Sequence, residues 1–88
     1  MKRERKIFSG RSNPELAKKI AISADCQLGD ISIKTFSDGE IWVKYEENVR
    51  GQDVFIIQST NGPSENIIEL ALMTDAAVRA SASTVNII

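Results

Sequence analysis

The sequence predicts an α/β domain, with a mainly parallel sheet flanked by helices and a β-hairpin beside it. Two observations predict this class. Short β-prone runs alternate with helical patterns along the 88 residues, and strands joined through helices usually run parallel. In addition, residues 54–57 form an uninterrupted apolar run, which is typical of a strand covered on both faces.

The first half of this alternation is a strand followed by a helix. The apolar run Lys6–Phe8 predicts the strand. A helix over residues 14–23 is predicted because Asn13 can cap free amide groups, Pro14 suits a first turn and Glu15 favours the positive end of the dipole. Apolar side chains recur at helical spacing and predict a face that packs on the sheet: Leu16, Ala17, Ile20 and Ala21.

The middle of the chain predicts a β-hairpin. Residues 31–36 and 41–45 alternate in polarity, and the turn-forming residues 37–40 separate them. Trp42 is expected to pack the hairpin, and the segment 48–51 is expected to end it.

The second half predicts strand, helix and strand again. The run 54–57 is expected to be the central parallel strand, and a loop rich in turn formers follows it. An apolar helix over residues 65–80 is expected to be mostly buried, with Ser64 as its N-cap. Residues 84–88 are β-prone, and no polar segment closes the fold after them, which predicts that the domain is truncated here.

Composition argues against several functional classes. Eleven basic and twelve acidic side chains give a net charge of -1, so neither nucleic acid nor a membrane is an expected partner. The basic start MKRERK is interpreted as a solvated tail rather than a membrane anchor. Without histidine the chain offers no Ser-His-Asp triad and no histidine-containing zinc site. The single cysteine, Cys26, fits a reducing cytosol.

The stretch FSDGE, Phe36 to Glu40, has two interpretations. Asp-Gly is a common hairpin-turn dipeptide, and an aromatic residue at a strand end usually packs in a core. Alternatively, Phe36 stacks on a flat ligand such as a purine, while Asp38 and Glu40 accept hydrogen bonds from an amine or from ribose hydroxyls. The residues alone favour the structural interpretation.

Three other segments are similarly ambiguous. Asn48–Gly51 contains Arg50, whose planar guanidinium suits phosphate but is more often solvated or ion-paired. Gly10–Asn13 precedes a helix, where amide groups can bind an anion, although a plain cap is the simpler role. Ser59–Gly62 follows a parallel strand, where ligands commonly bind, but it lacks the P-loop pattern.

Four segments, in order and spacing, resemble the opening of bacterial-type ribose-phosphate pyrophosphokinase, the phosphoribosyl pyrophosphate (PRPP) synthetase family. They are IFSGRSNPELAKKIA, FSDGEIWVKYEENVRG, DVFIIQST and IIELALMTDAAVRASAS. The resemblance implies a fold of two phosphoribosyltransferase-like α/β domains assembled into hexamers. Residues 1–88 would be an incomplete N-terminal domain of such an enzyme, in the cytoplasm.

By this resemblance the parent enzyme transfers the diphosphoryl group of ATP to ribose 5-phosphate with Mg²⁺, giving PRPP and AMP. Phe36, Asp38, Gly39 and Glu40 would form the ATP-binding hairpin, which reaches into a neighbouring subunit. Asn48 and Arg50 would belong to an allosteric site for phosphate and ADP.

The resemblance also implies what these residues lack. The catalytic loop, the metal ligands and the ribose 5-phosphate loop of the family lie beyond residue 88, so no catalytic or metal-binding residue is expected here, and the chain alone is expected to be inactive. The alternative is a non-catalytic regulatory or assembly module similar to PRPP synthetase-associated proteins. Retention of the FSDGE residues disfavours this alternative.

Overall fold

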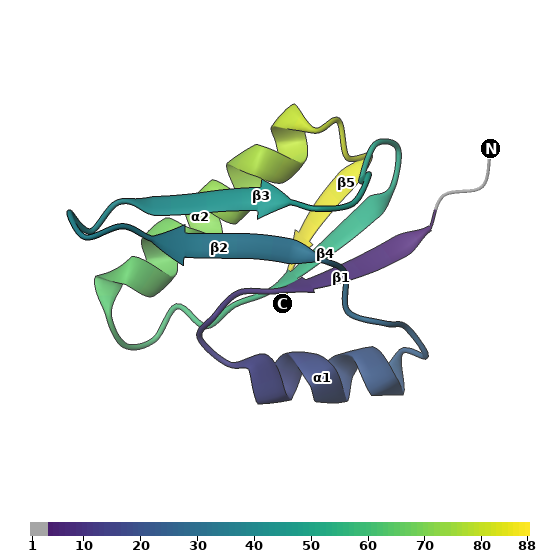
Figure 1. The fold of residues 1–88 in the computed structure, drawn as a ribbon. Coiled ribbons are helices and arrows are strands. Elements are labelled where there is room, and N and C mark those ends of the chain that lie inside the picture. The colour runs from purple at the N-terminus through teal and green to yellow at the C-terminus, as the bar shows by residue number, and fades with distance from the viewer. Residues whose placement is uncertain (1–3) are drawn as a thin grey trace.

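The computed structural model describes residues 4–88, which form five strands and two helices (Figure 1). In chain order these are β1 (Arg5–Ser9), α1 (Pro14–Ser23), β2 (Ile31–Thr35), β3 (Ile41–Tyr45), β4 (Asp53–Ile57), α2 (Ser64–Arg79) and β5 (Thr84–Ile87). The order matches the predicted alternation.

The prediction of a solvated tail at the N-terminus is wrong for its last residues. Arg5 and Lys6 belong to β1, where they pair with Asp53 and Val54 of β4. Lys6 also forms an ion pair with Glu47, at 2.6 Å between Nζ and Oε1. The remainder of the predicted tail, residues 1–3, lies outside the described residues.

The main sheet is parallel and has the strand order β1-β4-β5. Strand β4 is central, as the apolar run predicted, and Val54, Ile56 and Ile57 on it are buried. The hairpin of β2 and β3 is a separate antiparallel pair, in which Ile33 lies opposite Val43. The mainly parallel α/β architecture with a hairpin is therefore confirmed.

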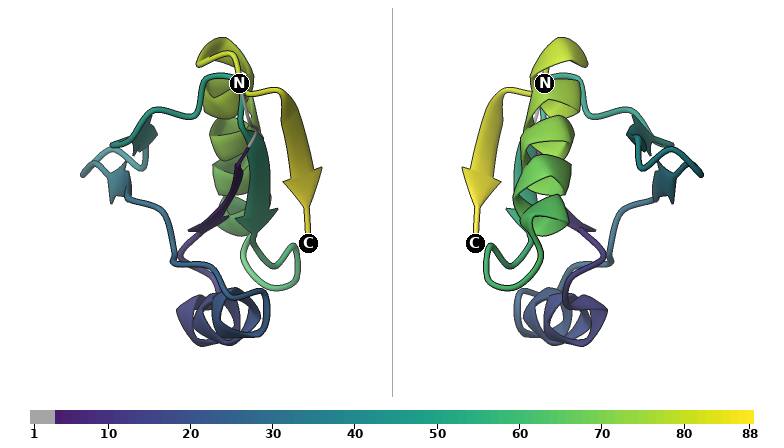
Figure 2. Two further views of the ribbon diagram at one scale, coloured as in Figure 1. Left: turned by 90° about the vertical axis from the view of Figure 1, so that its right-hand side faces the viewer. Right: turned by 90° about the vertical axis from the view of Figure 1, so that its left-hand side faces the viewer.

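Two hydrophobic clusters lie on the two faces of the main sheet. On one face Phe8, Val54 and Ile56 pack with Met73 of α2 and with the inner side chains of the hairpin. On the other face, Ile7 and Ile57 pack with α1. Figure 2 shows α1 set apart from α2 and the hairpin. The hairpin is thus held against the sheet face that α2 also covers.

Helix α1 has the predicted bounds and cap. The side-chain oxygen Oδ1 of Asn13 accepts a hydrogen bond from the backbone N–H of Leu16 at 3.1 Å, and Pro14 opens the helix. Ala17 and Ala21 are buried against the sheet, whereas Leu16 is 45% exposed. The face that packs is therefore narrower than the sequence predicted.

Helix α2 differs from its prediction in two respects, its N-cap residue and the extent to which it is buried. Ser64 is already helical, and the N-cap is Pro63, which makes no side-chain cap hydrogen bond. The predicted Ser64 cap is therefore wrong. The helix is also not mostly buried, because it packs only the face that carries Glu69, Met73 and Ala77. Its outer side chains remain accessible, and three of its large hydrophobic side chains are more than half exposed: Ile67, Ile68 and Val78.

Neither helix within residues 4–88 has the length and apolar character needed to cross a membrane.

Candidate nucleotide-binding hairpin

The tip of the hairpin, Phe36–Glu40, is a tight turn closed by its own hydrogen bonds. The backbone N–H of Phe36 donates to the carbonyl of Glu40 at 2.8 Å, and the N–H of Gly39 donates to the carbonyl of Phe36 at 2.9 Å. Gly39 has φ +88°, a conformation that glycine adopts without a steric penalty. Asp38 accepts from the N–H of Glu40 through Oδ1, at 3.0 Å. The turn chemistry predicted from Asp-Gly is present.

All five tip residues are exposed. The Phe36 side chain is half exposed, at 50%, so the interpretation of Phe36 as a core residue is wrong. A large aromatic side chain gains little from this position in the isolated domain, because exposed apolar surface contributes no burial free energy. The tip therefore presents an aromatic ring and two carboxylates to whatever lies beside it.

The tip lies at the end of the molecule toward which β1 and β4 point (Figure 1). Ligands of open α/β sheets commonly bind at the carboxyl ends of the parallel strands. A hydrogen bond of 2.7 Å from Nη2 of Arg11, just after β1, to Oγ1 of Thr35, just before the tip, joins the two regions.

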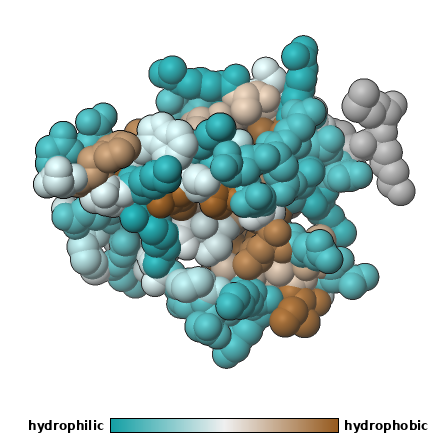
Figure 3. Space-filling view, viewed as in Figure 1, coloured by the Kyte–Doolittle hydropathy of each residue, from teal (hydrophilic) through white to brown (hydrophobic). Residues whose placement is uncertain are grey.

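Trp42 does not pack into the core of the hairpin. It lies opposite Lys34 in the β2–β3 register, is 39% exposed, and has the ammonium of Lys34 5.2 Å from its ring centroid. This is a cation–π distance. Trp42 therefore belongs to the outer face of the hairpin, and Figure 3 shows that hydrophilic residues predominate over this region of the surface.

The candidate effector residues lie on a turn at the other end of the hairpin. The side-chain oxygen of Asn48 accepts from the backbone N–H of Arg50 at 3.0 Å, and Gly51, with φ +73°, donates its N–H to the carbonyl of Ser81 at 2.9 Å. Both Asn48 and Arg50 are exposed. The structure brings these two together but separates them from Phe36 and Asp38 by the length of the hairpin (Figure 1).

The loops after β1 and β4 are joined by a buried polar network that sequence reasoning missed. Glu69 and Gln58 are 3% and 4% exposed. Glu69 accepts from Nε of Arg11 at 2.7 Å and from Nε2 of Gln58 at 2.9 Å. Gln58 in turn accepts from the hydroxyl of Ser12 at 2.6 Å. The position of Glu69 in an apolar run, on the same helical face as Met73, was the signal that could have identified it.

This network uses some of the backbone amide groups of the two alternative anion-binding segments, residues 10–13 and 59–62. The N–H of Arg11 donates to Glu69 at 2.7 Å, and that of Ser12 donates to Gln58 at 3.1 Å. The N–H of Ser59 donates to the hydroxyl of Ser12 at 2.7 Å. Both segments therefore serve as structural connections at the carboxyl edge of the sheet.

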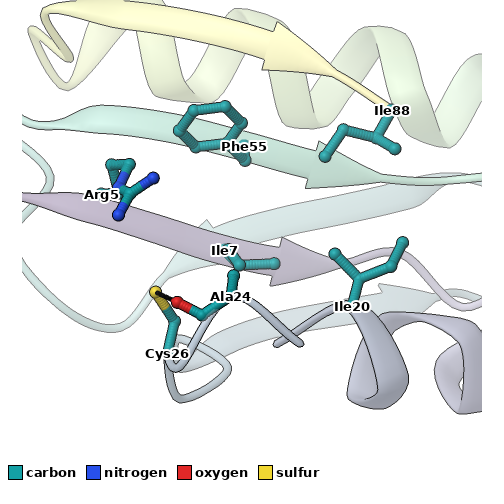
Figure 4. A pocket seen from close by; sticks show the side chains of 7 residues that line it. All are labelled: Arg5, Ile7, Ile20, Ala24, Cys26, Phe55 and Ile88. Carbon is teal, nitrogen blue, oxygen red and sulfur yellow. Dashed lines mark hydrogen bonds between the residues drawn. The ribbon is translucent and has the colours of Figure 1, made fainter. Parts of the chain in front are cut away.

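A separate apolar pocket of about 140 Å³ lies on the sheet face that α1 covers. Figure 4 shows side chains from β1, α1 and β4 around it, together with Cys26. The thiol of Cys26 donates a hydrogen bond to the carbonyl oxygen of Ala24 at 3.4 Å. Arg5 is the single charged residue of its lining. Few polar groups converge here, unlike in a typical ligand site, and none of the predicted site residues lines it.

Comparison with known proteins identifies the protein family that this chain matches. The family model for the N-terminal domain of ribose phosphate pyrophosphokinase matches residues 5–88. The ribose-phosphate pyrophosphokinase of Fusobacterium nucleatum is 57% identical over 84 residues, which cover 94% of this chain and 27% of that protein. Its counterpart in Bacillus subtilis is 56% identical over 84 residues, covering 94% and 26%.

A solved structure gives the same result. The crystal structure of phosphoribosylpyrophosphate synthetase from Mycobacterium smegmatis superposes with a TM-score of 0.92 at 35% identity, over 97% of this chain and 29% of that one. The chain thus spans about a quarter of the length of the curated relatives it matches.

The fold and the exposed tip define an α/β domain with a projecting β-hairpin. The chain belongs to the family of ribose-phosphate pyrophosphokinase N-terminal domains, since the family model covers all but its first four residues. The resemblance found in the sequence is confirmed.

Proposed function

We propose that this chain is the N-terminal part of a ribose-phosphate pyrophosphokinase, which transfers the diphosphoryl group of ATP to ribose 5-phosphate and yields PRPP and AMP. The family match over residues 5–88 supports the activity of the parent enzyme. In the proposal, residues 4–88 supply binding surfaces and the remaining three quarters of the enzyme supply the catalytic groups.

The exposed hairpin tip is the observation on which the proposal rests. Phe36 is half exposed at the end of a two-stranded arm, and stacking of a base on such a ring is worth about 1–3 kcal/mol. Asp38 uses Oδ1 within the turn, so Oδ2 and the carboxylate of Glu40 can accept from the exocyclic amine of adenine. Gly39 keeps the backbone tight between them.

The tip offers one wall of a binding pocket rather than a whole pocket. Its residues are exposed together on a projecting arm, so a ligand held by them would still face water on its other side. A second wall from a neighbouring subunit would complete the site, which favours an oligomeric parent with ATP sites shared between subunits. That this oligomer is a homo-hexamer in the cytoplasm is proposed from the family resemblance and not from the tip.

The turn at Asn48 and Arg50 is proposed to bind phosphate or ADP as effectors. The guanidinium of Arg50 is exposed on a turn that its own backbone N–H and Asn48 stabilise, and a guanidinium suits phosphate oxygens. Its distance from the tip makes it a separate site.

The proposed reaction needs Mg²⁺ with ATP. Across residues 4–88 no group of three or more histidine, cysteine, aspartate or glutamate side chains could hold a metal ion. The described residues therefore do not fit a metal centre, and the proposed roles of the tip and of Arg50 involve no metal bound by residues 4–88.

Substitution of Phe36 tests the proposal in the full-length enzyme. Phe36→Ala removes the stacking ring and should raise the KM for ATP by roughly 5- to 150-fold, the equivalent of about 1–3 kcal/mol, with the KM for ribose 5-phosphate unchanged. Trp42→Ala is the matched control, because it removes another exposed aromatic residue from the same hairpin, one that lies on β3 outside the tip. The control should leave both constants unchanged.

Equal effects of Phe36→Ala on the KM values for the two substrates would contradict a stacking role.

A second assay distinguishes the parent enzyme from the alternative, a regulatory or assembly module. The 88-residue chain by itself should form no PRPP, and adding it to a complete synthetase should leave that enzyme's activity and size unchanged. A change in either would favour the regulatory or assembly module.

A further inference from the structure

Arg11 lies where three segments of the domain meet. It follows β1, and its backbone N–H and its Nε donate to the two carboxylate oxygens of Glu69 on α2, each at 2.7 Å. Its Nη2 donates to the hydroxyl of Thr35 at the end of β2, also at 2.7 Å. One side chain therefore connects the sheet edge, α2 and the hairpin.

The Glu69 end of this connection is rigid. Glu69 is 3% exposed, and its Oε2 also accepts from Nε2 of Gln58 at 2.9 Å. Gln58 is fixed by Ser12, whose hydroxyl and backbone N–H both donate to its Oε1. A buried carboxylate with this many partners has little freedom to move, so the guanidinium that it binds is held in one orientation.

The Thr35 end of the connection is adjacent to the tip. Thr35 lies opposite Ile41, so this residue pair closes the strands immediately before Phe36–Glu40. Within the part of the chain that the structure describes, Arg11–Thr35 is the one side-chain hydrogen bond that joins residues 33–43 to the rest of the domain. The other hairpin anchor, from Tyr45 to α2, is at the far end.

The chemistry of arginine explains why one residue can make both connections. The planar guanidinium presents donors in fixed, divergent directions, whereas a lysine ammonium is a single point of attachment on a flexible stem. With Nε directed at Glu69, the Nη2 donor is left directed at Thr35. The orientation fixed by the buried carboxylate is thereby transmitted to the hairpin.

We propose that Arg11 is a positioning residue for the hairpin tip. By connecting Glu69 to Thr35, it fixes the direction in which Phe36, Asp38 and Glu40 project, so that the nucleotide-binding wall is preorganised. This inference rests on the proposed function for its ligand. The tethering of the tip itself rests only on the contacts described above.

The sharpest test is Thr35→Val, because it removes the hydroxyl that Arg11 binds while leaving intact the ion pair between Arg11 and the buried Glu69. Valine also suits a strand, so folding is preserved. Ser32→Ala is the matched control: it removes a hydroxyl from the same strand, one whose hydrogen bond to Glu46 (3.1 Å) stays within the hairpin end away from the tip. Arg11→Lys is the companion variant, which keeps the charge beside Glu69 but loses the second connection.

Two measurements on the full-length enzyme distinguish the effect of the Arg11–Thr35 bond on the hairpin tip from its effect on nucleotide binding. The first is hydrogen–deuterium exchange of the tip peptide without nucleotide, and the second is the KM for ATP compared with that for ribose 5-phosphate. If Thr35→Val removes a hydrogen bond of ordinary strength, we expect the tip to exchange about three- to tenfold faster. The KM for ATP should rise by a similar factor. Arg11→Lys should reproduce both changes, and the double variant should add little to either single one.

The outcomes are distinct. Tip exchange and KM for ATP in Thr35→Val within twofold of Ser32→Ala would overturn the proposal. Faster exchange of the tip together with equal changes in the two KM values would show that the Arg11–Thr35 bond holds the tip but does not position the nucleotide. This result would also overturn the proposal. If Phe36→Ala fails to raise the KM for ATP, the proposed function is wrong, whereas the exchange data still decide whether Arg11 tethers the tip.

Discussion

The hydroxyl of Tyr45 donates a 2.8 Å hydrogen bond to the carbonyl oxygen of Met73, and this bond joins the hairpin to α2. The ring also packs edge-to-face on Phe8, with centroids 4.7 Å apart and planes at 87°. Burial raises the pKa of the Tyr45 hydroxyl, so it remains a donor throughout the neutral range. One side chain therefore contributes both apolar packing and a satisfied polar group to the hairpin interface.

Removing only the hydroxyl should measure the polar part of this contact. Tyr45→Phe keeps the ring against Phe8, and the Met73 carbonyl loses one donor, so the free energy of unfolding should fall by about 1 kcal/mol. Tyr45→Ala also removes the ring and should cost roughly 3–5 kcal/mol. Urea unfolding followed by circular dichroism gives both values. A Tyr45→Phe variant as stable as the original would mean that the hydrogen bond contributes nothing.

The two helix N-termini give a paired prediction about capping. Asn13 accepts from the N–H of Leu16, so Asn13→Ala should lower the free energy of unfolding by about 1 kcal/mol. Ser64 makes no cap bond, because Pro63 is the N-cap of α2, so Ser64→Ala should change stability by less than about 0.5 kcal/mol. Thermal or urea unfolding of the two variants side by side checks the difference. Equal losses would contradict the capping geometry.

Local sequence patterns predicted the elements well, since the signals for them are themselves local. The Asn-Pro-Glu start defined α1 to the residue, and Asp-Gly between alternating runs defined the hairpin. The central position of β4 followed from its unbroken apolar run. The resemblance of the motifs then gave the family, which the comparisons confirm.

Tertiary relationships were not predicted, because no local pattern encodes them. That Glu69 would be buried, and that Arg11 would reach both Glu69 and Thr35, depends on how α2 and the hairpin meet over the sheet. The exposure of Ile67 and Val78 was not predicted for the same reason. An apolar helix face indicates that the helix can be buried, but it does not identify the element that covers it. The ligand roles of Phe36 and Arg50 remain predictions.

Glu47 provides a pH-dependent contribution to stability that links β1 to the base of the hairpin. Its Oε1 accepts from the ammonium of Lys6 at 2.6 Å and its Oε2 from the backbone N–H of Asp30 at 2.8 Å. The Lys6 bond first, and the Asp30 N–H second, lower the pKa of this carboxyl below its ordinary value of 4.5. Because the pair is partly exposed, screening by salt should weaken the contribution.

The sign of the pH effect follows from the lowered pKa. A carboxyl that is more acidic in the folded state stabilises the fold fully above its unfolded-state pKa, near 4.5, and loses that contribution as the pH falls through the lower folded-state value. Urea unfolding at several pH values between 3 and 7 should therefore show the original chain more stable than Glu47→Gln at neutral pH. The gap should narrow below about pH 4.5. Lys6→Met, which removes the main cause of the shift, should reduce the pH dependence in the same way. A gap between the original chain and Glu47→Gln that stays constant down to pH 3 would show that Glu47 is not the titrating group.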